Sequence, residues 1–300
     1  MEDCSEFQID CSRITFSKHF RRLSGKTQVY IAPDGDHYTT RLTHTTMVAR
    51  VARMAARALG LDEDLTEAIS LGHDLQHSCF GHAGEEMLNL LTQSVGGFDH
   101  AEQSLRAVDF LENEGKGLNL SIETRDGIRH HGLDGQLPYT PEGQIVRLLD
   151  KIYIFHDLED AVRANIIKPA DIPAETSQVF GDNLLLQINI LVKDLVKTSL
   201  KTGEIEFSNK IWELFLKQRR FNYEHIYLAN STIKEAQKGK MIIDYLFNYF
   251  MKNPSEMPTF YNYIAEKDGR ERAVADWIAG MTDRFAIRLF KERTIPVSLG

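Results

Sequence analysis

Residues 71–85 read LGHDLQHSCFGHAGE, and they place three histidines, one aspartate and one glutamate within fifteen positions. The preceding residues have helical apolar periodicity, and apolar side chains flank the charged Asp74. A carboxylate inside such an apolar helix is costly unless it is paired or bound to a metal. If the helix continues from His73 to His77, these two imidazoles share one face, because residues four apart are neighbours on a helix surface. The stretch therefore indicates a site for a metal or for acid–base chemistry.

Two residues far away in the sequence have the same character. His44 lies 29 residues before His73, in the helical segment RLTHTTMVAR, and Asp150 lies 76 residues after Asp74, among apolar residues. Together with His73 and Asp74 they form an H…HD…D pattern of four metal ligands, which leaves coordination positions open for water or a phosphate oxygen. Imidazole and carboxylate ligands suit Zn, Mn, Fe, Co or Mg, with a preference for the transition metals.

Helical periodicity dominates the rest of the chain and predicts an all-α protein. The expected helices span residues 41–59, 62–75, 81–92, 100–114, 142–164, 183–199, 209–217, 232–252 and 270–292. The segments 27–31 and 37–40 flank the turn sequence Pro33-Asp34-Gly35-Asp36, and they predict one short N-terminal β-hairpin. Because the chemistry-bearing residues lie before residue 170, we expect a metal-binding catalytic core over 1–170 and a helical lobe over 171–300, packed together as one structural unit.

Composition restricts the class of protein. The chain has 300 residues, of which 42% are hydrophobic and 26% charged, and its formal net charge is −8. These values are ordinary for a globular protein, and the negative sign argues against a nucleic-acid duplex as the main partner. No run approaches the roughly 18 apolar residues of a membrane-spanning helix, and the acidic N-terminus does not resemble a signal peptide. Three cysteines without a CxxC pair favour a reducing, cytoplasmic location.

The motif at 71–85 resembles the HD-superfamily signature of the deoxyguanosine triphosphate triphosphohydrolases. The resemblance covers nearly the whole chain through further blocks in the family's order: FRRLSGKTQVY at 20–30, TRLTHTTMVARVAR at 40–53, FDHAEQSL at 98–105 and VADWIAGMTDRFA at 274–286. It implies an HD-domain helical core that hydrolyses a deoxynucleoside triphosphate, dGTP above all, to a deoxynucleoside and inorganic triphosphate. It also implies homo-oligomers and a divalent metal, such as Mn or Mg, on the family ligand positions His44, His73, Asp74 and Asp150.

The segment after the HD pair carries candidate proton donors. His82 and Glu85 are three residues apart, close enough on a helix for the carboxylate to hold an imidazolium. The pair suits a general acid for the departing 5′-oxygen of deoxyribose, and the resemblance implies the same role. The alternative is a first-turn helix carboxylate beside a capping histidine. His77 and His100 are candidates for hydrogen bonds to the α-phosphate, and His100 matches an active-site histidine of the family. His100 also begins a predicted helix, where anions bind readily and where plain capping is the alternative.

Other residues are candidates for substrate contacts. Arg41 and Lys151 can neutralise the triphosphate, since an anion of about four charges needs such cations in a net acidic protein. Each could instead be a solvated surface cation. Gln28 matches a family glutamine that contacts the sugar 3′-hydroxyl. Tyr153 and Asp157 are candidates for the sugar pocket, where a tyrosine against the position of a 2′-hydroxyl would select deoxy substrates.

The sequence departs from the family pattern in the central motif. Gln76 stands where typical members have glycine, and Ser78 and Cys79 stand where they have two prolines, so we expect a different turn there. Two other functions stay open: an HD-superfamily phosphomonoesterase or phosphodiesterase acting on another nucleotide, and a non-catalytic nucleotide sensor. All four ligands and the His82–Glu85 pair are present, which favours an enzyme. We expect no membrane association, and nucleic acid only as an effector.

Overall fold

The computed structural model describes residues 4–31 and 38–296, and helices make up nearly all the regular secondary structure in these ranges. The expected all-α fold is therefore confirmed. Two compact units share the chain in interleaved segments. The first unit comprises Met1–Ile14, His44–His73 and Leu120–Ile233, and the second comprises Thr15–Thr43, Asp74–Asn119 and Lys234–Gly300. The division expected near residue 170 stays a prediction.

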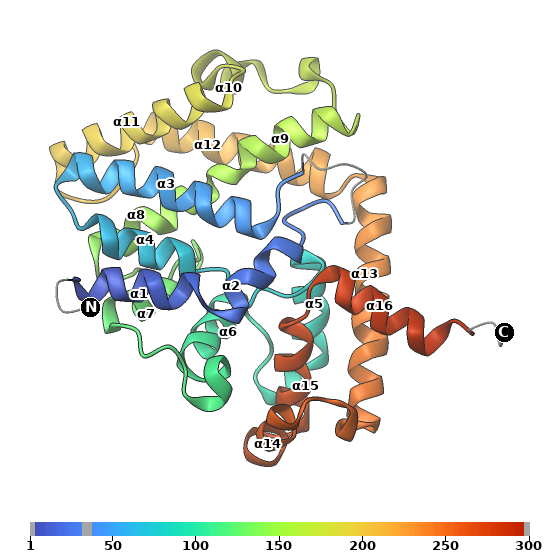
Figure 1. Ribbon diagram of the computed structural model, residues 1–300. Coiled ribbons are helices and arrows are strands. Elements are labelled where there is room, and N and C mark those ends of the chain that lie inside the picture. The colour runs from blue at the N-terminus through green and yellow to red at the C-terminus, as the bar shows by residue number, and fades with distance from the viewer. Residues whose placement is uncertain (1–3, 32–37, 297–300) are drawn as a thin grey trace. The chain divides into compact units, whose positions relative to one another are not determined.

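The first unit is built around one apolar core. Its helices are α1 (Glu6–Thr15), most of α3 (Arg41–Leu59), α4 (Glu63–Gly72), α7 (Ile122–Arg129), α8 (Pro141–Leu149), α9 (Tyr153–Arg163), α10 (Ala174–Phe180), α11 (Leu184–Thr202) and α12 (Asn209–Asn222) (Figure 1). The core side chains come from the apolar faces of α3, α8, α9, α11 and α12, and they include Val48, Leu149, Phe155, Leu191 and Phe215. Burying each such side chain contributes roughly 1.5–3 kcal/mol, so the packing of these faces stabilises the unit.

Two glycines allow α4 and α7 to cross at very short range. A Cβ atom added at Gly127 would lie 2.5 Å from Ile69 Cδ1, and one added at Gly72 would lie 2.5 Å from Ile128 Cδ1. Such distances are shorter than real Cβ contacts, so each glycine leaves the space that the isoleucine of the opposite helix fills. Gly72 is the last residue of α4, so this crossing also fixes the position of His73, which follows directly.

The second unit has a separate apolar core. Its helices are α2 (Lys18–Arg22), α5 (Gly81–Leu91), α6 (His100–Arg106), most of α13 (Asn230–Lys252), α14 (Thr259–Asp268), α15 (Arg270–Ala279) and α16 (Asp283–Thr294). Helix α13 lies along α5 (Figure 1), and a Cβ atom at Gly239 of α13 would lie 2.9 Å from the Cβ atom of Phe80. Buried Leu88, Leu246 and Ile278 belong to the same core. The first turn of α5 is thereby packed against a long helix.

The turn before α5 is a strained backbone held by a buried carboxylate. Phe80 and Gly81 both have left-handed backbone angles, with φ of 61° and 58°. The backbone N–H of Phe80 donates to Asp283 Oδ1 at 2.9 Å, and the backbone N–H of Thr27 donates to Asp283 Oδ2 at 3.0 Å. A non-glycine residue in this conformation costs about 1–3 kcal/mol, which these bonds and the packing of Phe80 offset. These contacts therefore fix the direction in which α5 starts.

The helix expected at 62–75 ends early, at Gly72. Residues 73–76 form a turn instead, so the expectation that His73 and His77 share one helical face is wrong. The Nδ1 atom of His73 lies 2.7 Å from the Ser70 carbonyl oxygen, an acceptor that the backbone N–H of Asp74 would use in a continued helix. The side chain of His73 thus competes with the helical hydrogen bond and helps to end the helix.

Two long predicted helices are interrupted. The helix expected at 142–164 contains a 3₁₀ turn at Asp150–Ile152, which separates α8 from α9. The helix expected at 270–292 breaks after Ala279, and the Thr282 hydroxyl accepts a hydrogen bond from the Phe285 N–H to cap α16. Helical periodicity continues across both breaks, and this is why the sequence pattern did not predict them.

The predicted β-hairpin is only partly within the described residues. Its turn sequence at 33–36 lies outside them. In the described part, the one feature of β structure is an isolated antiparallel bridge between Thr27 and Thr40. The backbone N–H of Arg41 also donates to the Lys26 carbonyl at 3.2 Å, so the two ends of this segment lie side by side.

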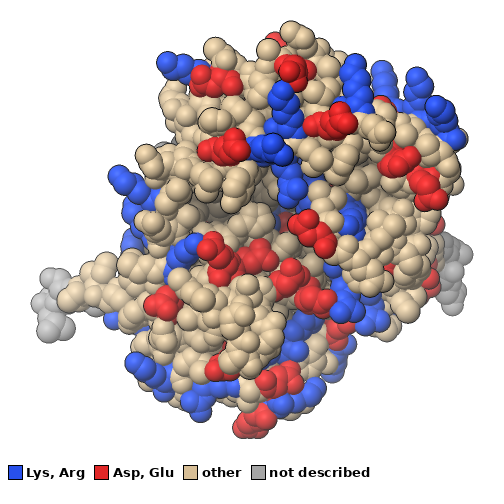
Figure 2. All heavy atoms as spheres, turned by 180° about the vertical axis from the view of Figure 1, so that it is seen from behind, with Lys and Arg blue, Asp and Glu red and all other residues tan. Residues whose placement is uncertain are grey.

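The surface carries mixed charge on the face that Figure 2 shows. Lysine and arginine side chains are interspersed there with aspartate and glutamate, and no continuous basic stripe crosses the described part of that face. Among the described residues, no helix is both long enough and apolar enough to cross a membrane.

The crossing of α4 and α7 predicts an intolerant glycine. Gly127→Ala should destabilise the protein by roughly 1–3 kcal/mol, because the added methyl overlaps Ile69 and the backbone must move. Urea unfolding followed by circular dichroism measures this. The control is Gly132→Ala, where nothing lies within 4 Å of the added Cβ atom and little change is expected. Equal midpoints for the two variants would contradict the close crossing.

Candidate active site

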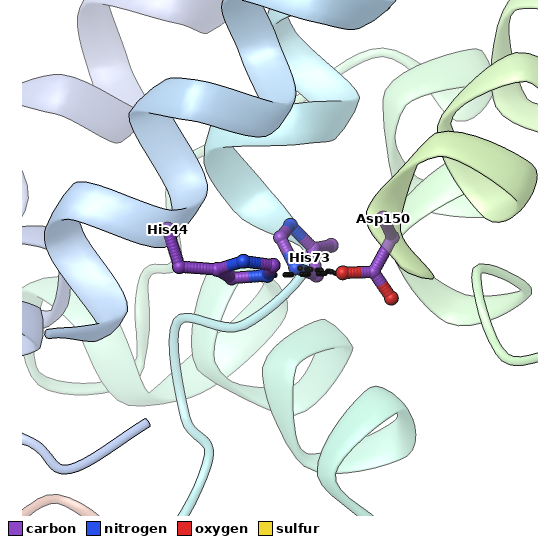
Figure 3. A group of neighbouring side chains, drawn as sticks. All are labelled: His44, His73 and Asp150. Carbon is purple, nitrogen blue, oxygen red and sulfur yellow. Dashed lines mark hydrogen bonds and ion pairs between the residues drawn. The ribbon is translucent and has the colours of Figure 1, made fainter. Parts of the chain in front are cut away.

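Three of the predicted metal ligands meet in the first unit (Figure 3). His44 lies in the first turn of α3, His73 follows the end of α4, and Asp150 follows the end of α8. The Nε2 atoms of His44 and His73 lie 3.0 Å and 3.3 Å from Asp150 Oδ1. All three residues are 3% exposed or less. Helices far apart in the sequence thus bring two imidazoles onto one carboxylate oxygen.

Neighbouring groups fix the charge states of this cluster. His73 Nδ1 donates to the Ser70 carbonyl at 2.7 Å, which orients the ring so that Nε2 faces Asp150. Lys151 Nζ donates to the other oxygen of Asp150 at 2.5 Å. Burial would raise the pKa of Asp150, but Lys151 and the two imidazoles hold it well below its ordinary value. The carboxylate is therefore ionised at neutral pH.

This donor set fits a divalent metal ion. One nitrogen of each imidazole and one oxygen of Asp150 all lie within 4.8 Å of one another. Ligand atoms at about 2.0–2.2 Å from one ion are themselves roughly 3–4 Å apart, so the three atoms need only small shifts to bind one. The Ser70 carbonyl accepts a hydrogen bond from the other ring nitrogen of His73 and so orients the ring. Metal-binding imidazoles are commonly oriented by such a hydrogen bond. His44, His73 and Asp150 could therefore hold a metal ion by their chemistry and spacing.

The fourth predicted ligand, Asp74, belongs to the second unit. Its Oδ2 accepts a hydrogen bond from Arg41 Nη1 at 2.6 Å, and its Oδ1 lies 4.0 Å from His100 Nε2. Arg41 is 2% exposed, and its Nε and Nη2 atoms are buried without a hydrogen bond. Buried donors without an acceptor are costly, so this arginine is suited to receive a further anion. Asp74 stays a predicted ligand, and the structure pairs it with Arg41.

A third histidine, His131, lies beside the first-unit cluster, and the sequence analysis did not single it out. It is fully buried, and its ring packs edge-on to that of His73 with centroids 5.0 Å apart. Its Nδ1 donates to the Ile128 carbonyl at 2.8 Å, in the same way that His73 bonds Ser70. The available signal was the sequence His130-His131-Gly132 at the end of α7, which by itself is also compatible with an exposed turn.

Two predicted sugar-pocket residues also lie in the first unit. The ring of Tyr153 packs edge-on to that of His44, with centroids 5.6 Å apart. Asp157 is 2% exposed and accepts a hydrogen bond from the hydroxyl of Tyr227. Sequence reasoning missed Tyr227, which lies in the π-helical turn Tyr223–Tyr227. Such turns are rare and are often found at functional sites, but only the structure reveals them.

His77, His82, His100 and Glu85 form a compact cluster in the second unit. The ring centroid of His77 lies 5.2 Å from that of His82 and 4.7 Å from that of His100. Glu85 Oε2 lies 3.3 Å from His82 Nδ1 and 3.3 Å from His77 Nε2. Glu85 Oε1 lies 2.7 Å from His100 Nδ1 and accepts the His100 backbone N–H at 2.9 Å. Glu85 therefore contacts all three imidazoles, whereas the sequence predicted only its contact with His82.

The members of this imidazole cluster differ in burial and therefore in charge. The side chain of His82 is 70% exposed, whereas His77 is fully buried. Burial holds the pKa of His77 well below its usual value. Burial lowers the pKa of His100 too, but Glu85 outweighs it, and the net shift is upward. Burial would raise the pKa of Glu85, yet His100 lowers it strongly through its charge and its hydrogen bond. Glu85 is thus ionised beside a neutral His77.

Gln28 lies near Arg41 and the start of α5. Its side-chain carbonyl oxygen is buried without a hydrogen bond. A Cβ atom at Gly81 would lie 3.2 Å from the Gln28 backbone oxygen and 3.7 Å from Arg41 Nη2, so the absence of a side chain at Gly81 permits this approach. Lys26 is fully buried and donates from Nζ to the His77 carbonyl at 2.7 Å, while burial lowers its pKa to about 7. Lys26 thereby connects the backbone next to Gln28 with the backbone at His77.

The first-unit cluster predicts a metal-dependent gain in stability. Wild-type protein should be stabilised by added Mn²⁺, by about 2.7 kcal/mol at one hundred times the dissociation constant. Asp150→Asn keeps the size of the side chain but removes its charge, so its affinity for Mn²⁺ should fall at least about tenfold. Thermal unfolding with and without Mn²⁺ measures both. Asp126→Asn is the control, since that carboxylate bonds His130 at 2.8 Å outside the cluster. An unchanged response in Asp150→Asn would remove Asp150 from the ligand set.

Family models and relatives match this chain over most of its length. The HD domain matches residues 41–153, and the phosphohydrolase-associated domain matches residues 205–292. A solved structure of a hypothetical protein from Aquifex aeolicus has a TM-score of 0.51 at 17% identity, covering 95% of this chain and 68% of that one, and it shows a shared fold alone.

Curated relatives extend the match to nearly the whole sequence. The deoxyguanosinetriphosphate triphosphohydrolase-like protein of Caldanaerobacter subterraneus subsp. tengcongensis is 50% identical over 97% of this chain and 86% of its own length. The proteins of the same name from Clostridium tetani and from a Ruegeria species are 43% and 34% identical, over 97% and 95% of this chain and 86% and 92% of their own lengths. The matched HD segment contains His44, His73, Asp74 and Asp150. The chain therefore belongs to the HD-domain family of deoxyguanosinetriphosphate triphosphohydrolase-like proteins.

Proposed function

We propose that the protein hydrolyses deoxynucleoside triphosphates to a deoxynucleoside and inorganic triphosphate. The observation that supports the proposal is that the chain brings two imidazoles beside one carboxylate at His44, His73 and Asp150, and an imidazole beside a carboxylate at His82 and Glu85. Cleavage between the α-phosphorus and the 5′-oxygen needs both kinds of group. The names of the relatives favour dGTP among the possible substrates.

The metal-binding role is assigned to His44, His73 and Asp150, with Asp74 as the fourth ligand that the family pattern implies. When bound, a divalent ion supplies Lewis-acid stabilisation of phosphoryl oxygens and a water of lowered pKa. We expect Mn²⁺ or Mg²⁺ in the active enzyme, and Fe, Co or Zn also suit these ligands. Lys151 neutralises Asp150 and is a cation that can turn to a triphosphate oxygen.

The leaving group is protonated by His82 in this proposal. A sugar alkoxide leaves poorly, so a positioned acid contributes typically 10²–10⁴-fold to the rate. His82 is exposed enough to meet substrate and solvent, and Glu85 lies beside its Nδ1 atom. His100, whose pKa is raised chiefly by Glu85 against the opposing effect of burial, is suited to bind the anionic α-phosphate. His77, beside Glu85, is the second candidate for a contact with the same phosphate.

Arg41 is assigned to the phosphates. Two of its guanidinium nitrogens are buried without a hydrogen bond, and one of them lies near Gly81 at the N-terminus of α5. Helix N-termini and guanidinium groups both favour anions. Gln28, with its buried and unbonded carbonyl oxygen, can accept a hydrogen bond from a sugar 3′-hydroxyl.

The choice of sugar is assigned to Tyr153 and Asp157 in the first unit. Asp157 is buried, and the hydroxyl of Tyr227 fixes the direction of its carboxylate. A ring at Tyr153 can exclude a 2′-hydroxyl by its volume, which would make the enzyme selective for deoxynucleotides. Homo-oligomers, a cytoplasmic location and nucleic acid as an effector are further proposals from the family resemblance and composition.

The proposed reaction predicts a specific product. With Mn²⁺ or Mg²⁺, each dNTP should give deoxynucleoside and inorganic triphosphate, with dGTP the fastest and GTP far slower. Ion-exchange chromatography of the products measures this directly. Gln28→Ala should raise KM, since the contact to the 3′-hydroxyl is lost. Release of orthophosphate or pyrophosphate would instead indicate a phosphatase or phosphodiesterase, and binding without turnover would indicate a sensor.

The proposed acid predicts how two substitutions combine. His82→Ala should lower kcat about 10²–10⁴-fold and leave KM nearly unchanged. Glu85→Gln should be at least as slow, because Glu85 also holds His100. The double variant should be no slower than Glu85→Gln, since residues that act as one unit are not additive. Steady-state kinetics measure all three. If His82→Ala keeps a normal kcat, or loses only in KM, another residue such as His100 is the acid.

A further inference from the structure

The two oxygens of Glu85 are used in different ways. Glu85 Oε1 is bonded by two groups of His100, at 2.7 Å from Nδ1 and at 2.9 Å from the backbone N–H. Glu85 Oε2 lies at a longer distance, 3.3 Å, from both His77 Nε2 and His82 Nδ1. The first oxygen is therefore anchored, and the second is held between two imidazole nitrogens.

The spacing of these three atoms matches one coordination sphere. Two ligands about 2.1 Å from a tetrahedral ion are roughly 3.4 Å apart. The distances from Glu85 Oε2 to His77 Nε2 and to His82 Nδ1 are both 3.3 Å. One nitrogen of each histidine and one oxygen of Glu85 also lie within 4.8 Å of one another. Short ion pairs would instead draw the nitrogens to the 2.7 Å that His100 shows.

His77 is an available nitrogen ligand. It is fully buried, and its Nε2 makes no hydrogen bond. Its Nδ1 faces the Ser78 carbonyl at 3.5 Å, so the proton is best placed there and the Nε2 lone pair points toward Glu85. The neutral imidazole is the form that binds metals.

His82 and His100 complete the requirements of a site. The side chain of His82 is 70% exposed and gives an ion a path from solvent. The bonds from His100 fix Glu85, in the way that outer partners orient metal-binding carboxylates. All four residues belong to the second unit.

We propose that His77, His82 and Glu85 form a second metal site, separate from His44, His73 and Asp150, that binds a transition-metal ion of the zinc class. Two imidazoles and one carboxylate with an open fourth position suit Zn²⁺, Co²⁺ or Fe²⁺. Mg²⁺ binds poorly at such a site because it prefers oxygen ligands.

Zinc bound at this site would also affect catalysis, and this consequence rests on the proposed function. An ion on His82 Nδ1 and Glu85 Oε2 removes the pair that holds the acidic proton. Zinc would therefore act on the acid as well as on the metal-dependent centre, and excess zinc would inhibit. The binding itself does not depend on what the enzyme hydrolyses.

Zinc stoichiometry of the full chain tests the site. Metal-free protein is titrated with Zn²⁺ against a chromophoric chelator, and bound zinc is counted after gel filtration. His82→Ala should bind one equivalent fewer than wild type, and Glu85→Gln should match it. Asp150→Asn should keep the equivalent that His82→Ala loses. His225→Ala removes an exposed histidine of the first unit and should bind as wild type. Since His82 is largely exposed, its replacement leaves the fold intact.

A chemical readout accompanies the count. Zinc should protect His82 from diethyl pyrocarbonate, as judged by peptide mass, while Mg²⁺ should not. Equal zinc content in wild type and His82→Ala, or modification of His82 at the same rate with and without zinc, would overturn the proposal. Absence of dNTP hydrolysis would contradict the proposed function but would leave the zinc count unchanged.

Discussion

Each of the two candidate clusters, one in each unit, depends on an ionised carboxylate inside a helical core. Removing such a charge from water costs several kcal/mol unless partners compensate, so its surroundings are constrained. Asp150 has two imidazoles and Lys151 around it, and Glu85 has three imidazoles. Histidine is suited to this task because it can bind a proton, a metal or a hydrogen-bond acceptor at nearly constant volume. Asp150 and its partner His73 lie directly after the ends of α8 and α4, whereas Glu85 lies within α5.

Much of the fold could be predicted from the pattern of apolar residues. Helical periodicity located α3 at its observed bounds and placed most other long helices within a few residues. The chemical residues could be found for a related reason. A charged or imidazole side chain such as Asp74 or His44 within an apolar stripe needs a partner, and the sequence shows such residues even when it does not show the partner. The three-residue spacing of His82 and Glu85 sufficed to predict their contact.

What could not be predicted is set by contacts between distant segments. The bond of His100 to Glu85 spans 15 positions, and that of Tyr227 to Asp157 spans 70. The pairing of Arg41 with Asp74 likewise depends on how the chain folds back. Local patterns carry no signal for such contacts. They also failed at His73, where a side chain competes with a backbone hydrogen bond and ends the helix, although apolar residues continue to the position of Leu75.

The crossing of α4 and α7 has a consequence for how this sequence can change over generations. Each helix contributes one glycine and one isoleucine, and the two pairs, Gly72 with Ile128 and Gly127 with Ile69, are reciprocal. Side-chain volume at the crossing can therefore be redistributed between the two helices, but the total volume cannot increase. A larger residue at 127 is compatible with the same helix spacing only if position 69 becomes smaller, and positions 72 and 128 are linked in the same way. These four positions should therefore vary as two coupled pairs: a single larger residue is selected against, whereas a compensating change at its partner position is tolerated. Because His73 follows Gly72 directly, its position depends on the same pairs.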